Sequence, residues 1–313
     1  MKLLMGPAPH LRSNDDVRKI MFDVILALTP ATIFGIVTFG FNALLLVLSA
    51  MISAEALEFF IMRVMRKKKD FKSNLSAATT GLLLALNCSA FVKWWQVLIG
   101  VIVAIGIAKH VFGGLGKNIW NPALVGRVFM TLSFPVAMTT WITPFDLQTT
   151  ATPLAYMKTN SIIPWNIGQA FLGTIPGCIG EVSALLLLLG FGWLVYRKRI
   201  KLMIPIAYIG TVFIVSSIFY FANSSFGNPL MHIFSGGLML GALFMATDMV
   251  TSPMSIKGCM IFGVGCGVIT LVIRYFGGMN EGVSFSILLM NALVPLIDSI
   301  SRRKVFGEVK KNA

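Results

Sequence analysis

Five ionisable side chains lie within or at the ends of long apolar stretches of this sequence: Glu55, Glu58, Arg127, Glu181 and Asp248. A charge held away from water is costly, so each marks a pathway, a binding site or an internal ion pair. Glu181 follows an Ile-Pro-Gly interruption at 175–177 and is the strongest functional candidate. For Arg127 the alternative is a structural pair with a carboxylate, and Glu58 and Asp248 can reach the ends of their segments.

Metal chemistry on this chain alone is not indicated. The four cysteines lie far apart, and none forms a Cys-x-x-Cys pair or a Cys/His cluster: Cys88, Cys178, Cys259 and Cys266. Isolated cysteines in apolar runs usually serve as small packing residues. The sequence therefore predicts no metal site and no catalytic side chain of its own. A cluster shared with a partner subunit stays open.

One polar stretch, residues 142–168, is rich in threonine and proline and has no spanning pattern. It is longer than a simple connection between helices. Long ordered loops in compact proteins tend to be functional. Its densest part, Asp146 to Leu154, reads DLQTTATPL and offers three threonine hydroxyls.

The elements that position these residues follow from composition. Of the 313 residues, 56% are hydrophobic and only 12% are charged, whereas soluble domains carry about 25% charged residues. A surface so poor in charge must face lipid. Water-soluble classes are excluded, including a nucleic-acid binder suggested by the net charge of +14.

Apolar runs near the length of a spanning helix recur along the chain, and backbone pairing in hydrocarbon requires helices. The sequence predicts an all-α polytopic membrane protein with about ten transmembrane helices. Two runs rich in small residues, 75–92 and 229–248, can instead be broken or re-entrant. The ten runs are 21–40, 41–62, 75–92, 94–112, 119–141, 177–196, 202–221, 229–248, 258–276 and 283–299.

The basic residues predict the orientation. If the N-terminus is cytoplasmic and each run crosses once, 22 of the 26 Lys and Arg residues lie inside, including Lys109. Lys93, Lys158 and Arg274 lie outside, and Arg127 lies within a span. The positive-inside rule demands this asymmetry. It places residues 142–168 outside the cytoplasm.

An internal repeat divides the membrane part. Phe112-Gly113-Gly114 precedes Asn121, and Phe276-Gly277-Gly278 precedes Asn291. About five spans per half force the halves into opposite orientations, an arrangement that places functional sites at the interface of the halves. Chance similarity is the alternative. The predicted organisation is a cytoplasmic segment, a first repeat, an extracytoplasmic loop, a second repeat and a cytoplasmic tail, at 1–20, 21–141, 142–168, 169–300 and 301–313.

Several blocks together resemble one known family. They are 73–76 with 80–86, 113–123, 173–181, 241–248 and 291–298. They are similar to the D subunit of the Rnf-type ion-translocating electron transport complex, a relative of the B subunit of the sodium-pumping NADH:quinone reductase. The resemblance covers most of residues 15–300.

The resemblance implies that Thr152 carries FMN through a phosphodiester formed by its hydroxyl. Asp146, Thr149, Thr150 and Ala151 form the surrounding motif, in which Thr150 stands where the family usually has Gly or Ser. The small Ala151 leaves the hydroxyl accessible, and Pro153 favours an extended backbone before it. A second, non-covalent flavin such as riboflavin is also implied.

The resemblance further implies electron relay within a ferredoxin:NAD+ oxidoreductase complex that moves Na+ or H+ across the bacterial cytoplasmic membrane. The chain would be one subunit of this translocase and incomplete alone. Partners would be the other membrane subunits, a second flavin-bearing subunit, iron-sulfur and NADH-binding subunits, lipid, and a flavin transferase acting outside the cytoplasm. Among the ionisable residues of the apolar runs, Glu181 is the strongest candidate for a transport or flavin-related role, and a structural role is the alternative. The alternative from another class is a channel or permease for a small solute.

Overall fold

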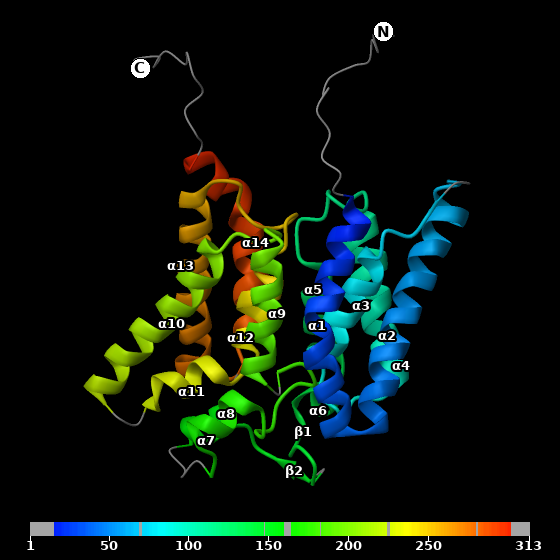
Figure 1. Ribbon diagram of the computed structural model, residues 1–313. Coiled ribbons are helices and arrows are strands. Elements are labelled where there is room, and N and C mark those ends of the chain that lie inside the picture. The colour runs from blue at the N-terminus through cyan, green and yellow to red at the C-terminus, as the bar shows by residue number, and fades with distance from the viewer. Residues whose placement is uncertain are drawn as a thin grey trace, which may run out of the picture.

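The structure is a computed structural model that describes residues 16–68, 71–146, 148–159, 164–181, 183–223, 226–279 and 281–301. It is a bundle of helices with one two-stranded sheet (Figure 1). In the described part, six helices are long and apolar enough to cross a membrane, which confirms a multi-pass all-α membrane protein. They are α1 (Val17–Phe39), α2 continued by η1 (Phe41–Met65), α4 continued by η2 (Trp94–Val111), α10 (Met203–Ala222), α13 (Ile256–Phe276) and α14 (Val283–Ile300).

The other four predicted runs form shorter helices. These are α3 (Ser76–Leu86), α5 (Pro122–Ser133), α9 (Ala184–Tyr196) and a broken segment made of α11 (Pro229–Phe234), α12 (Leu238–Leu240) and η4 (Gly241–Met245). At 1.5 Å per residue, the 11 residues of α3 span about 16 Å, roughly half the hydrocarbon core. These four runs are therefore shorter or broken apolar helices in the described structure. The helix α5 ends before Pro135, because proline cannot donate the next helical hydrogen bond.

The break in the 229–248 run lies at Ser235, Gly236 and Gly237. Both glycines adopt positive φ, 73° and 71°, which glycine tolerates because it lacks a Cβ. The freed carbonyls accept from the Arg274 guanidinium at 2.5 Å for His232, 3.0 Å for Ser235 and 3.2 Å for Gly236. Arg274, which the sequence placed on the non-cytoplasmic side, lies in the last turn of α13 and is 4% exposed.

The structure corrects the position of Lys109, which the sequence placed in a cytoplasmic turn. It lies within η2 (Ile102–Val111) and is 1% exposed. Its ammonium pairs with Glu58 on α2 at 2.7 Å and donates to the Ser76 hydroxyl at 2.7 Å. Glu58 thus stays in the interior. One turn earlier, Glu55 accepts from the backbone N–H of Ala78 at 3.0 Å. The helix α2 therefore contacts the start of α3 directly through Glu55 and indirectly through the Glu58–Lys109 pair.

The two halves of the chain approach most closely between α1 and α9. A Cβ added to Gly190 of α9 would overlap the Ala27 carbonyl of α1, and one added to Gly35 of α1 would overlap the Ile179 carbonyl. Glycine at both positions lets the backbones meet, as small residues do between membrane helices.

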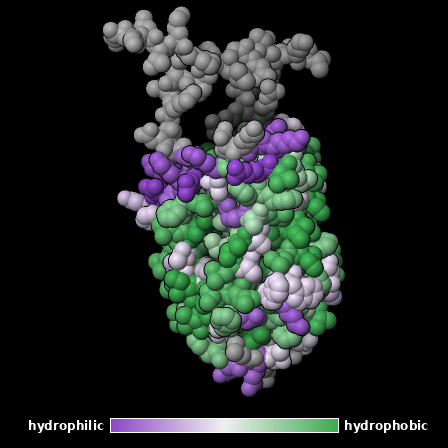
Figure 2. Space-filling view, turned by 90° about the vertical axis from the view of Figure 1, so that its right-hand side faces the viewer, coloured by the Kyte–Doolittle hydropathy of each residue, from purple (hydrophilic) through white to green (hydrophobic). Residues whose placement is uncertain are grey.

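The ends of the bundle differ. The start of α1 and the end of α14 lie at one end, where hydrophilic side chains gather above apolar flanks (Figures 1 and 2). At the opposite end lie α6 (Pro135–Thr139), β1 (Trp141–Ile142), β2 (Thr149–Thr150), α7 (Pro153–Lys158) and α8 (Ile167–Leu172). Of the predicted terminal segments, residues 1–15 and 302–313 lie outside the described residues. The helix α1 begins at Val17, inside the predicted segment 1–20.

Candidate functional site

The polar stretch after α6 folds into a hairpin that positions the candidate motif. The strands β1 and β2 pair antiparallel, with Trp141 opposite Thr150. The connecting turn is fixed to the bundle, because the Phe145 N–H donates to the Thr38 carbonyl at the end of α1 at 3.2 Å. The hairpin thereby delivers the residues after Thr150 to the lower face of α5 and α6.

Thr152 lies directly after this hairpin, at the start of α7. Its backbone is extended, with φ −74° and ψ 158°, as expected before Pro153. The hydroxyl oxygen accepts from the Ala155 N–H at 3.3 Å, so Thr152 caps α7. The residue is only 3% exposed. The hydroxyl is therefore held inside the protein rather than displayed on a free loop.

The space beside Thr152 is a cavity of about 440 Å³. Thr150, Ala151 and Thr152 form part of its wall, whereas Asp146 and Thr149 lie on the exposed side of the hairpin and do not line it. The structure thus brings together three of the five motif residues. Apolar side chains from α5, α6, β1 and α14 make up much of the remaining wall: Val128, Leu132, Met138, Trp141 and Phe285.

A buried ion pair forms the polar part of the same wall. Arg127 on α5 is 6% exposed and its Nη2 lies 2.5 Å from Glu281 Oε2. Its Nη1 donates to the Ser284 hydroxyl of α14 at 2.5 Å. Arg127, Glu281 and Ser284 all line the cavity. The pairing of Arg127 with a carboxylate, one of two alternatives left by the sequence, is confirmed.

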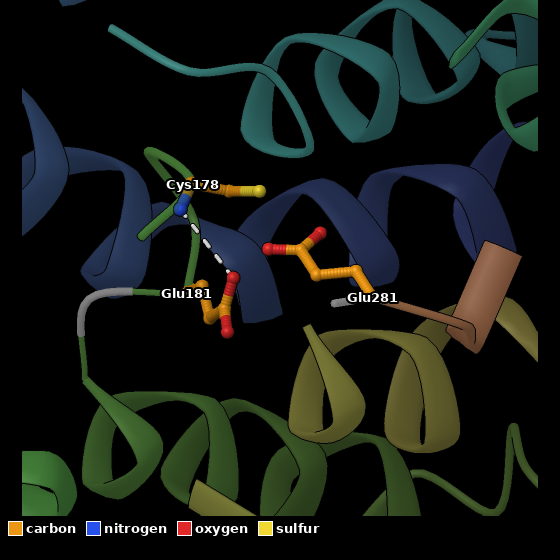
Figure 3. A group of neighbouring side chains, drawn as sticks. All are labelled: Cys178, Glu181 and Glu281. Atoms are coloured by element: carbon orange, nitrogen blue, oxygen red, sulfur yellow. Dashed lines mark hydrogen bonds between the residues drawn. The ribbon is translucent and has the colours of Figure 1, made fainter. Parts of the chain in front are cut away.

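Behind the ion pair lies a second carboxylate. Ligand atoms of Cys178, Glu181 and Glu281 lie within 4.8 Å of one another. Figure 3 shows the Glu281 carboxylate directed toward the other two side chains. Glu181 accepts from the Cys178 N–H at 3.4 Å (Figure 3). It also accepts from the N–H of Gly237, which lies at the start of α12. Glu181 therefore accepts from the backbone N–H that follows the helix break, whereas Arg274 of α13 donates to the carbonyls of Ser235 and Gly236 at the break.

The donor set of this cluster, one thiol and two carboxylates, could ligate a cation by residue type. Arg127 already supplies positive charge there, since its Nη2 also lies 3.6 Å from Cys178 Sγ. Within the cluster, Arg127 pairs with Glu281, whereas Glu181 accepts from two backbone N–H groups. Cys178 is buried, as the sequence predicted for a packing residue, and it also contacts Arg127.

Two wall residues, Glu281 and Ser284, escaped the sequence reasoning. Glu281 falls in the connection between two apolar runs, where a charged residue is ordinary. The usable signal was an unpaired arginine inside the 119–141 run, which requires a carboxylate from elsewhere in the chain. Sequence alone does not say which one, because the partner is 154 residues away.

Comparison with known proteins shows the family of this chain. The sequence pattern of the NQR2, RnfD, RnfE family matches residues 4–307. The chain belongs to this family. It is 46% identical to the D subunit of the proton-translocating ferredoxin:NAD(+) oxidoreductase complex of Clostridium ljungdahlii, over 97% of this chain and 96% of that protein. It is 42% identical to the D subunit of the Na(+)-translocating ferredoxin:NAD(+) oxidoreductase complex of Acetobacterium woodii, over 100% and 98% of the two chains.

Membership of the NQR2, RnfD, RnfE family confirms the resemblance drawn from the sequence blocks. A more distant member, the D subunit of the ion-translocating oxidoreductase complex of Stutzerimonas stutzeri, is 38% identical over 95% of this chain and 93% of its own length. The similarity therefore extends over both halves of the membrane bundle and the hairpin between them.

Proposed function

We propose that this chain is the D subunit of an ion-translocating ferredoxin:NAD+ oxidoreductase complex and relays electrons through FMN bound covalently to Thr152. The observation that carries the proposal is the placement of Thr152, a buried residue with a hydroxyl group, in the wall of a cavity of about 440 Å³. Sites for small molecules and cofactors commonly have volumes of about 300–1,000 Å³.

The residues of the cavity fit a flavin. A tricyclic ring needs flat apolar contacts, and Trp141 and Phe285 line the wall. The ring edge carries hydrogen-bonding oxygen and nitrogen atoms, and Arg127 and Ser284 offer polar groups to it. When bound, FMN supplies one-electron chemistry that no side chain of this protein has.

Attachment to Thr152 is compatible with its local structure. The hydroxyl oxygen would lose its proton and bond to the flavin phosphorus of an activated flavin nucleotide supplied by the transferase, while the bond from that phosphorus to the leaving phosphate group breaks. The resulting ester oxygen could still accept from the Ala155 N–H, as the hydroxyl does here. Because Thr152 is buried, we expect the flavin transferase to act before the hairpin packs against α5 and α6. Asp146 and Thr149, on the exposed side of the hairpin, then remain available for recognition by that enzyme.

The proposal includes ten membrane segments in two inverted halves. Each half contributes five apolar helical segments in the described structure, from α1 to α5 and from α9 to α14, with the 229–248 segment broken. The repeated asparagines also meet: with the Asn291 amide oriented to satisfy its neighbours, its oxygen accepts from the Asn121 N–H at 3.2 Å. This contact is what an interface between related halves would produce.

We place the protein in the bacterial cytoplasmic membrane with both termini cytoplasmic and the hairpin outside. The hydrophilic end of the bundle near the start of α1 supports this orientation (Figure 2), together with the bias of basic residues toward the same side. The hairpin lies at the other end (Figure 1).

Partners and the transported ion follow from the same assignment. Relatives are named as subunits of both proton- and Na+-translocating complexes, so we propose the other subunits of such a complex as partners and leave the ion to a Na+-dependence measurement. We also propose a second, non-covalent flavin, without assigning residues to it. A solute permease is the alternative function if no covalent flavin is found.

The test is flavin fluorescence that stays with the denatured polypeptide on a gel. The chain, coexpressed with a flavin transferase, should fluoresce, and Thr152→Val should abolish the band. Thr159→Val is the matched control, because it removes an exposed hydroxyl seven residues after Thr152 that belongs neither to the motif nor to the cavity wall. A dark wild-type band, or a bright Thr152→Val band, would overturn the assignment.

A further inference from the structure

We infer that the Arg127–Glu281 ion pair is the electrostatic control of the flavin proposed at Thr152, with the two charges acting in opposite directions. This inference rests on the proposed function. Arg127 favours the reduced ring and Glu281 opposes it. The pair, rather than either residue alone, then sets how readily the ring takes up electrons.

The first support is position. Arg127 and Glu281 line the same cavity as Thr152, although they come from α5 and from the connection before α14. A ring tethered at Thr152 and placed in this cavity therefore has a guanidinium and a carboxylate in its wall. The pair is not a distant feature of the bundle.

The second support is burial. The side chain of Arg127 is 7% exposed and that of Glu281 is 14% exposed. Charges held away from water are weakly screened, so their effect on a neighbouring group is larger than that of surface charges. A reduced flavin carries more negative charge than an oxidised one, so a buried cation in the wall stabilises it and a buried anion destabilises it.

The third support is an atom that the ion pair does not use. Glu281 binds Arg127 through Oε2, whereas Oε1 is buried and has no hydrogen-bond partner in the described part of the structure. Arg127 similarly divides its contacts between Glu281 and Ser284. A purely structural salt bridge would be expected to satisfy both carboxylate oxygens. The incomplete pairing leaves Glu281 oriented by the pair but with capacity for a further group.

The test is a redox titration of the tethered flavin in the full chain, purified in detergent after coexpression with a flavin transferase. The same titration on matching chains that also carry Thr152→Val isolates the tethered flavin by difference. The variants are Arg127→Gln, Arg127→Lys, Glu281→Gln and the double variant Arg127→Gln/Glu281→Gln. Lys158→Gln is the control, because it removes an exposed cation only six residues after Thr152.

We expect Arg127→Gln to lower the ratio of reduced to oxidised flavin at a fixed potential by about tenfold, which is about 59 mV for a one-electron couple. Glu281→Gln should raise the ratio by a similar factor. The double variant should lie between them. Its comparison with Glu281→Gln measures the effect of Arg127 even if Arg127→Gln alone folds poorly, because no Glu281 charge is then left without a partner. Arg127→Lys should stay within about threefold of wild type because the charge is kept, and so should Lys158→Gln, because solvent screens it.

Shifts of the same sign for Arg127→Gln and Glu281→Gln, no shift in either, or equal ratios in the double variant and in Glu281→Gln would overturn this inference while leaving the covalent flavin in place. A wild-type chain without covalent flavin would overturn the proposed function, and the inference with it. In-gel fluorescence of each variant, measured first, separates the two failures.

Discussion

Replacing Arg274 by methionine should destabilise the protein by removing the donor that holds the broken 229–248 segment. The guanidinium donates to the carbonyls of His232, Ser235 and Gly236 from a side chain that is almost fully buried. A hydrogen bond to a charged group contributes about 1.5–3 kcal/mol, and a carbonyl left unpaired in the interior costs about 1–3 kcal/mol. Allowing for non-additivity among three bonds on one group, we expect a loss of about 4 kcal/mol.

The assay is thermal unfolding of the detergent-purified chain, followed by the fraction that remains monodisperse after heating. For a chain of this size such a loss corresponds to roughly a 10 °C decrease in Tm. Arg197→Met is the matched control: its Nε lies 3.4 Å from Asp23 Oδ2, but its side chain is 43% exposed, so the loss should be at most about 1 kcal/mol. If Arg274→Met melted together with the Arg197 variant, the helix break would be stable without this donor and our account of the break would be wrong.

Three further predictions concern the membrane bundle. Lys109→Met should destabilise the chain by about 3–5 kcal/mol in the same thermal assay, since it strands the buried Glu58 carboxylate, and adding Glu58→Gln should restore most of the loss; an additive double variant would contradict this. Gly190→Val should reduce the yield of folded protein because the new side chain meets the α1 backbone, whereas Gly192→Val, with open space around it, should not; equal yields would refute the close α1–α9 contact. A cysteine introduced at the exposed position Thr149 should react with an impermeant thiol reagent added outside intact cells. The label reports on this position because the four native cysteines are buried. Labelling only after lysis would reverse the orientation.

Much of the fold followed from local sequence properties. Long runs without charged residues predict that the surface of the bundle faces lipid. The hydrophobic residues that cover its flanks agree with this prediction (Figure 2). The small residues of the 229–248 run suggested that it could be broken, and the break at Gly236 and Gly237 confirms that alternative. The extended backbone at Thr152 followed from Pro153, because the steric effect of proline on its predecessor is independent of tertiary structure.

What the sequence missed depends on contacts between distant segments. The sequence predicts a turn position for Lys109 and a place on the outer side for Arg274, and it names no partner for either. Both are buried, since Glu58 on another helix pairs with the first and the carbonyls of a broken helix accept from the second. The cavity beside Thr152 was equally beyond reach, because its wall comes from segments on both sides of the hairpin.

The most direct test of the central claim is the mass of the tryptic peptide that contains Thr152. Cleavage after Arg127 and Lys158 releases residues 128–158. We predict a peptide heavier than its sequence by one FMN less one water, with fragmentation placing the addition on Thr152. An unmodified mass, or an addition on Thr149 or Thr150 instead, would contradict the account of Thr152 as the flavin attachment site.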